Sequence, residues 1–140
     1  MIKLNILILL ALFMAGGLYS LSNEDMRTIM DKKTATVGDA IYVIYSIDNP
    51  DAVIADIDKI NLPSIKALNR DQNLDAGTLA IIAIEFGKAY GGAYYRLTGF
   101  SRYAAQSLVY DGIFPESFSW NRSISGKELI ELTGAIKGHR

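Results

Sequence analysis

Glu85 is the side chain best suited to acid–base chemistry, because it is the one acid in a strongly apolar run from Leu79 to Phe86. A carboxyl group among apolar side chains stays protonated to higher pH and can act as a general acid. Glycoside hydrolysis needs a second carboxylate facing the first, and the sequence marks none. The alternative is a structural Glu85 that is partly exposed or paired with Lys88 or an arginine.

The sequence contains few residues that could act as a nucleophile or bind a metal ion. The chain has no cysteine and a single histidine, His139, in its C-terminal tail. A thiolate nucleophile, a Ser-His-Asp triad and a zinc site of several histidines are therefore excluded. Asp48, Asp51, Asp56 and Asp58 lack the spacing of a calcium loop, so we interpret them as solvated acids near helix starts. No metal site and no cofactor are predicted.

Aromatic residues gather in one stretch of the chain, with arginines between them. The rings are Phe86, Tyr90, Tyr94, Tyr95, Phe100, Tyr103, Tyr110, Phe114, Phe118 and Trp120. Aromatic faces and guanidinium donors suit sugar rings, peptide stems or the surface of a partner protein. The predicted binding face consists of Tyr94, Tyr95, Arg96, Arg102, Trp120 and Arg122. In the alternative interpretation most of these rings belong to the core, and only the tyrosine hydroxyls reach the surface.

Composition excludes two further classes of protein. The chain has 140 residues, 50% of them hydrophobic and 21% charged, with a net charge of −1. This length predicts one domain with an adequate core. Because Lys and Arg do not cluster, nucleic-acid binding is not expected. The segment from Gly87 to Gly92 lacks the preceding strand and the Gly-Lys-Ser/Thr ending of a phosphate loop, so a nucleotide-binding site is not expected.

The first residues differ from the rest of the chain. Lys3 precedes a nearly continuous apolar run from Leu4 to Leu18, and Ser20 and Ser22 follow. This is the layout of a secretory signal peptide, which we assign to residues 1–22. The run is short for a membrane span, although an uncleaved N-terminal anchor is the alternative and the only expected membrane contact. A periplasmic or extracellular location follows.

A short phrase occurs three times and predicts where helices begin. In each copy an apolar residue precedes Thr36, Asp75 or Ser125, and an apolar run follows. Thr, Asp and Ser are favoured N-caps, since a side-chain oxygen can accept a hydrogen bond from an unpaired N–H of the first helical turn. The three phrases, each with a loop and a preceding helix, predict a pseudo-repeat of helix pairs.

The whole chain is expected to form an all-α single domain of about six or seven short helices. The expected helical segments are 24–32, 37–47, 50–60, 64–68, 76–86, 94–97, 102–110 and 126–137, the shortest of them being single turns. By propensity alone Ile41 to Tyr45 would form a strand, but the preceding cap phrase favours a buried helix. Pro50 is expected at the first helical position and Ser101 as an N-cap.

The third phrase and the helix before it resemble the S-layer homology module. Tyr103-Ala104-Ala105 through Tyr110-Asp111-Gly112-Ile113 is similar to the helix that ends in Gly-Ile. Ile124-Ser125-Gly126-Lys127-Glu128 is similar to the phrase that opens the next helix. The resemblance is best over residues 101–137 and implies a helical domain, here 23–138 with a tail at 139–140, and an envelope setting. The arginine that helps the family to bind cell-wall polysaccharide is replaced by Gly126, and by Ala76 and Val37 in the other copies.

These observations predict an exported, non-enzymatic envelope module. Its expected partner is cell-wall glycan or an extracytoplasmic protein assembly. One alternative is an accessory structural subunit of an envelope machine that binds protein only. Another is a small cell-wall hydrolase that uses Glu85.

Overall fold

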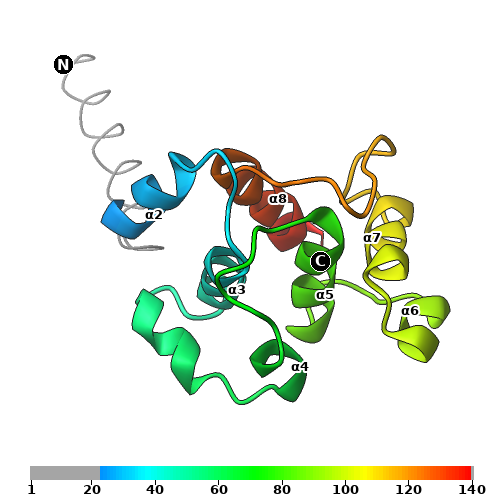
Figure 1. The fold of residues 1–140 in the computed structure, drawn as a ribbon, viewed down its shortest axis with the longest axis horizontal. Helices are drawn as coiled ribbons and strands as arrows, with labels where there is room; N and C mark the ends of the chain where they lie inside the picture. The colour runs from blue at the N-terminus through cyan, green and yellow to red at the C-terminus, as the bar shows by residue number, and fades with distance from the viewer. Residues whose placement is uncertain (1–22, 140) are drawn as a thin grey trace, which may run out of the picture.

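Short helices build the described part of this protein, and three of them begin at a side-chain N-cap (Figure 1). The computed structural model describes residues 23–139, and the predicted signal peptide lies outside them. The helices are α2 (Asn23–Met30), α3 (Val37–Ser46), the 3-10 helix η1 (Ile54–Lys59), α4 (Pro63–Lys66), α5 (Ala76–Glu85), α6 (Ala93–Thr98), α7 (Ser101–Tyr110) and α8 (Gly126–Gly138). Within the described residues there is no strand, so the expected all-α single domain is confirmed. The pairing of helices into repeats stays a prediction.

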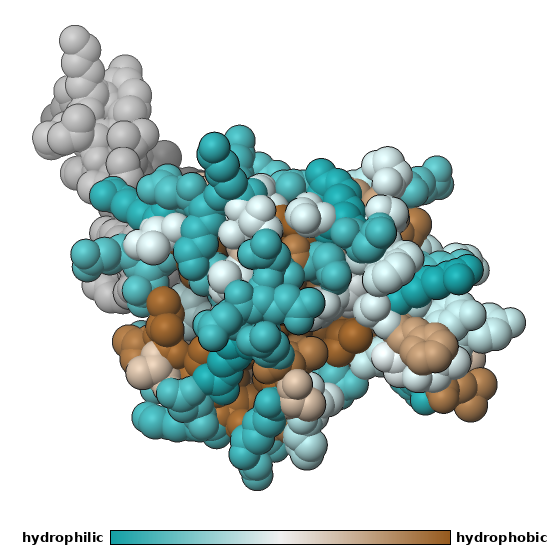
Figure 2. Space-filling view, viewed as in Figure 1, coloured by the Kyte–Doolittle hydropathy of each residue, from teal (hydrophilic) through white to brown (hydrophobic). Residues whose placement is uncertain are grey.

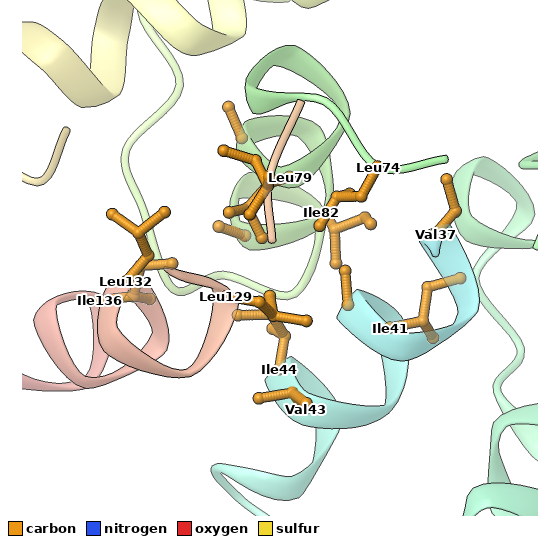
Figure 3. Packing of buried hydrophobic residues seen from close by; sticks show 14 of the residues in the cluster. Val37, Ile41, Val43, Ile44, Leu74, Leu79, Ile82, Leu129, Leu132 and Ile136 are labelled. Carbon is orange, nitrogen blue, oxygen red and sulfur yellow. The ribbon is translucent and has the colours of Figure 1, made fainter. Parts of the chain in front are cut away.

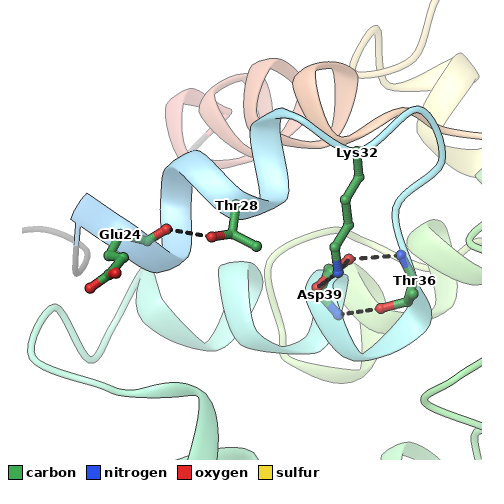
Figure 4. A network of polar contacts seen from close by, with 5 residues as sticks. All are labelled: Glu24, Thr28, Lys32, Thr36 and Asp39. Carbon is green, nitrogen blue, oxygen red and sulfur yellow. Dashed lines mark hydrogen bonds and ion pairs between the residues drawn. The ribbon is translucent and has the colours of Figure 1, made fainter.

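The three predicted caps are confirmed in atomic detail. The side chains of Thr36, Asp75 and Ser125 each accept a hydrogen bond from the N–H group three residues later. At α3 the cap is reciprocal, because the carboxylate of Asp39 accepts from the N–H of Thr36 at 2.9 Å. Lys32 lies 2.9 Å from the same carboxylate, which is 7% exposed, and so neutralises its charge (Figure 4).

The residues that precede the caps are joined by a closed ring of three backbone hydrogen bonds. The N–H of Ala35 donates to the carbonyl of Ile124 at 2.8 Å, that of Ile124 to Leu74 at 3.1 Å, and that of Leu74 to Ala35 at 2.8 Å. All three residues are fully buried. We call this arrangement the cap ring. It ties together three segments that are far apart in the sequence.

The cap ring continues into the first turn of each helix. The N–H groups of Val37, Ala76 and Gly126 donate to the carbonyls of Gln72, Arg122 and Lys32 at 2.9, 2.9 and 3.0 Å. Each helix thus satisfies an otherwise unpaired N–H with the strand-like segment that leads into another of the three phrases. The start of α8 comes closest to its neighbour, because a Cβ atom on Gly126 would lie 1.7 Å from the carbonyl oxygen of Ile29.

The apolar core lies between α3, α5 and α8 (Figure 3). Ile41 and Ile44 of α3, Leu79 of α5 and Leu129 of α8 are fully buried there, with Ile82 beside them. The segment from Ile41 to Tyr45 is therefore a buried helix, as the cap phrase predicts and as strand propensity does not. On its outer side α5 packs most extensively against α7.

Two local predictions are wrong. Pro50 does not begin a helix, because the carboxylate of Asp56 accepts a hydrogen bond from the N–H of Val53 at 3.0 Å and fixes the start of η1 after it. Ser101 is the first residue of α7, and its N-cap is Phe100, which has no side-chain acceptor.

Candidate functional site

The helices α6 and α7 form a short hairpin that projects at one end of the long axis of the molecule (Figure 1). Gly99 joins them with a φ of 69°, a left-handed conformation that favours glycine. The N–H of Gly99 donates to the carbonyl of Tyr95 at 2.7 Å and closes the end of α6. At the other end of α6, Gly92 is the N-cap. The hairpin is therefore set by two glycines and held against α5 through α7.

Large apolar and aromatic side chains stand exposed on this hairpin and in the loop just before it. Tyr90, Tyr94, Leu97, Phe100 and Tyr110 have exposed fractions of 71, 70, 85, 62 and 91%. Five such neighbours form a patch that a monomeric soluble domain rarely leaves in water without a function. We call these five residues, with Tyr103, the aromatic surface. In Figure 2 the apolar side chains at the projecting end are visible in brown and tan.

A groove of about 370 Å³ runs between α6 and α7. Its aromatic lining consists of Tyr90, Tyr94, Tyr95, Tyr103 and Tyr110. The rings of Tyr94 and Tyr103 stack with their centres 5.5 Å apart. Gly92 and Ser107 also line the groove, and a Cβ atom on Gly92 would lie 3.7 Å from that of Ser107. The absence of a side chain at Gly92 therefore leaves space between the helices.

A second hollow, of about 320 Å³, lies along another side of α7. Arg102, Trp120 and Phe118 contribute to its walls. Gln106 lines both this hollow and the groove, so α7 forms the ridge between them. Trp120 is 43% exposed.

The structure divides the predicted binding face between these two hollows. Tyr94 and Tyr95 line the groove, whereas Arg102 and Trp120 line the second hollow. Arg96 lines neither of them, and its guanidinium lies 4.7 Å from the centre of the Tyr90 ring while its Nε donates to the carbonyl of Gly91.

Arg122 has a structural partner at the start of α8. Its Nη1 lies 2.6 Å from the carboxylate of Glu128, and its guanidinium lies 4.3 Å from the centre of the Phe118 ring. Burial alone would raise the pKa of Glu128, but the hydrogen bonds from Arg122 and from the N–H of Ser125 hold it below its usual value. Arg122 therefore stabilises the third cap phrase.

Glu85 accepts hydrogen bonds from two hydroxyl groups. Its carboxylate lies 2.8 Å from the hydroxyl of Tyr95 and 3.0 Å from that of Ser64. Tyr95 is only 8% exposed, and its burial, with the adjacent carboxylate, raises its pKa. Glu85 thus links α5 to α4 and α6. Glu85 is partly exposed, as the structural alternative predicts, but its partners are hydroxyl groups, and the Nζ of Lys88 pairs with Asp48 instead.

Charges of both signs lie around the groove, and Asp111 is the one charged residue in its lining. The stretch from Phe86 to Tyr110 contains Lys88, Arg96 and Arg102 and no Asp or Glu. Lys88 is neutralised by Asp48, but neither arginine forms an ion pair within residues 23–139. The exposed aromatic surface therefore carries two guanidinium groups without a carboxylate partner.

Of the residues that line the groove, the predicted binding face contains only Tyr94 and Tyr95, and it misses the α7 residues Tyr103, Gln106 and Tyr110 among others. Tyr103, Gln106 and Tyr110 follow one another at i, i+3 and i+7 along α7. Residues at this spacing share one face of a helix. Once a helix over 102–110 had been predicted, this spacing would have placed the three side chains on one face.

Comparisons with protein-family models, with curated proteins and with solved structures returned no match. Among residues 23–139, no helix combines the length and the apolar character that crossing a membrane requires.

Proposed function

We propose that this protein is an exported, non-enzymatic module of the cell envelope that docks on cell-wall material or on an extracytoplasmic protein assembly. The observation that carries the proposal is the aromatic surface, with two unpaired arginines beside it. Tyr, Trp and Arg are the residues most often found at binding hot spots. Exposed apolar patches of this kind mark interaction sites.

Within the predicted binding face, four residues are proposed to touch the partner. Tyr94, Arg96, Arg102 and Trp120 are exposed on α6, on α7 and in the loop that follows. Tyr95 and Arg122 are proposed to act indirectly. Tyr95 fixes the hairpin through Glu85, and Arg122 fixes the end of the loop through Glu128.

The envelope setting rests on the predicted signal peptide at residues 1–22 and on the resemblance to the S-layer homology module. The family's arginine position is occupied by Gly126, whose place in the structure leaves no room for a side chain beside Ile29. Docking through the aromatic surface is consistent with that loss. It also fits the accessory-subunit alternative, in which the partner is protein alone.

The hydrolase alternative has less support. Both oxygens of the Glu85 carboxylate accept hydrogen bonds that hold neighbouring helices, which is a structural use of the group. Glu85→Gln tests this alternative directly. The hydrolase requires lytic activity on cell walls in the wild type and its loss in this variant.

Two capture experiments test the proposed function with the full chain. Sedimentation with purified cell-wall sacculi measures wall binding, and a photo-crosslinker placed at Trp120 captures a protein partner in intact envelopes. Arg102→Ala and Tyr94→Ala are expected to weaken capture at least about tenfold, as loss of a hot spot does. Arg27→Ala, an exposed change on α2, is the matched control. The proposal fails if neither material is captured, or if Arg102→Ala and Tyr94→Ala both bind like the wild type.

A further inference from the structure

The charges at the two ends of α7 oppose the dipole of the helix. Arg102 is the second residue of α7, and Asp111 is its C-cap. A helix carries partial positive charge at its N-terminal end and partial negative charge at its C-terminal end, so each side chain lies where its charge is disfavoured. Neither forms an ion pair within residues 23–139, although Glu116 lines the same hollow as Arg102. The single chain therefore leaves both charges without a counter-charge.

The outer side of α7 is an exposed ridge that is complementary to itself. Arg102, Gln106 and Tyr110 are exposed at a spacing of four residues and so share one face. Tyr103 lies beside Arg102, whose guanidinium is 5.7 Å from the centre of its ring, and Asp111 follows Tyr110. From its start to its end the ridge presents a cation, a ring, an amide, a ring and an anion. Reversing the ridge exchanges the two charges and leaves the rings in place.

This pattern identifies a second copy of the chain as the occupant of the ridge. Going beyond the proposed function, we propose that two copies associate through the aromatic surface, with their α7 helices antiparallel about a twofold axis. The midpoint of Arg102 and Asp111 coincides with that of Tyr103 and Tyr110, between Gln106 and Ser107. One axis at this point brings Arg102 of each copy beside Asp111 of the other, and Tyr103 beside Tyr110.

The shape of the hairpin fits this pairing. The α6–α7 hairpin projects at one end of the molecule, so a second copy can approach it from outside (Figure 1). The ridge of α7 lies between the groove and the second hollow, and ridges of one helix pack into the grooves beside another. Tyr110 of one copy can enter the groove of the other, where the absence of a side chain at Gly92 leaves space. Asp111 is the charged residue that an incoming Arg102 meets there.

The exposed area is about that of a stable dimer. At about 200 Å² for each large side chain, the five exposed members of the aromatic surface present roughly 700 Å². Each partner in a specific protein interface contributes about 800 Å². The charged and polar residues of the ridge supply the remaining area. A second copy therefore covers the whole patch with a surface of equal size and matching charge.

Sedimentation velocity of the purified full chain tests the pairing, with no cell-wall material or other protein present. A reversible monomer–dimer equilibrium is expected across roughly 1 μM to 1 mM. Arg102→Asp and Asp111→Arg each place like charges together at both symmetric contacts. Each is expected to raise the dissociation constant of the dimer at least about tenfold. Both give a helix end the charge that its dipole favours, so circular dichroism should show an intact fold.

The double variant Arg102→Asp/Asp111→Arg exchanges the two charges and is expected to restore association to within about threefold of the wild type. Lys127→Asp is the matched control. It makes the same change of charge at the second residue of another helix, α8, and Lys127 lies outside the aromatic surface and both hollows. This variant should associate like the wild type.

A cysteine at the axis gives a second measurement. The chain has no cysteine, so Gln106→Cys can form a disulfide only with another copy. Under mild oxidation this variant is expected to yield a covalent dimer, because the twofold axis passes beside residue 106. Lys127→Cys, exposed on α8, is the control and should stay largely monomeric.

Four outcomes overturn the pairing. They are a wild-type chain that stays monomeric over this range, single charge variants that associate like the wild type, a double variant as weak as the single ones, and equal crosslinking at positions 106 and 127. The docking function is judged separately. If the chain is monomeric but capture of sacculi or of a protein still depends on Tyr94 and Arg102, docking stands and the pairing is wrong.

Discussion

The close approach of α8 to α2 leads to the sharpest stability prediction, for Gly126→Ala. A Cβ atom on residue 126 would lie 1.7 Å from the carbonyl oxygen of Ile29 and 2.7 Å from its carbonyl carbon. A carbon and an oxygen that are not bonded need about 3.2 Å, so the end of α2 must move by roughly 1.5 Å. That movement disturbs the packing of Ile29, whose side chain is 1% exposed. It also weakens the hydrogen bond from the N–H of Gly126 to the carbonyl of Lys32.

The expected cost follows from these two losses. Overpacking costs about 1–3 kcal/mol, and a lost backbone hydrogen bond costs about 1 kcal/mol. We expect Gly126→Ala to lower the free energy of unfolding by about 3 kcal/mol, and Tm by roughly 10–15 °C. Urea unfolding followed by circular dichroism measures the first quantity, and a thermal scan measures the second.

Gly134→Ala is the matched control on the same helix. A Cβ atom at Gly134 meets nothing within 4 Å, and the position is exposed. Alanine there should stabilise the protein by about 0.5–1 kcal/mol, because it favours the helix over glycine. Equal stability of the Gly126→Ala variant and the wild type would refute the packing of α8 on α2 described above.

Three further predictions concern single side chains. Ser125→Ala should lower the free energy of unfolding by about 1 kcal/mol in urea titrations, since it removes the cap of α8. Glu128→Gln should destabilise the protein at neutral pH. Because the folded-state pKa of Glu128 is lowered by Arg122, its contribution is present above its ordinary pKa of 4.5 and is lost as the pH falls through the folded-state value. The difference between the two proteins should thus shrink on acidification, and a constant difference down to about pH 3 would contradict the ion pair. Tyr95→Phe should cost about 1 kcal/mol, measured by thermal unfolding, because it leaves one oxygen of Glu85 without its donor; an unchanged Tm would contradict that hydrogen bond.

Local rules predicted the start of the main helices. Thr36, Asp75 and Ser125 act as caps because the cap bond joins residues only three apart, and so the sequence alone contains both partners. The cap at Thr36 likewise predicted a helix, and not a strand, for the segment from Ile41 to Tyr45. A cap rule applied to Ser101 was wrong, since Phe100 holds the cap position there and the helix begins with no side-chain acceptor.

Contacts between distant segments could not be read from the sequence. Tyr94 and Tyr95 are adjacent and chemically identical, yet one is exposed and the other is buried against Glu85. A helix as short as α6 gives too few turns for periodicity to assign its faces. The pairing of Lys88 with Asp48 likewise joins residues from two separate helix ends, and only the packing of α3 against α5 brings them together.

The cap ring has a consequence for the order in which the protein acquires its structure during biosynthesis. Ile124 contributes one third of the ring, and it follows Ala35 and Leu74 by a long stretch of chain. Until Ile124 is available, the N–H of Ala35 and the carbonyl of Leu74 have no partner in the ring, and α8 has not covered the core. The native fold can therefore be completed only after nearly the whole domain has been synthesised.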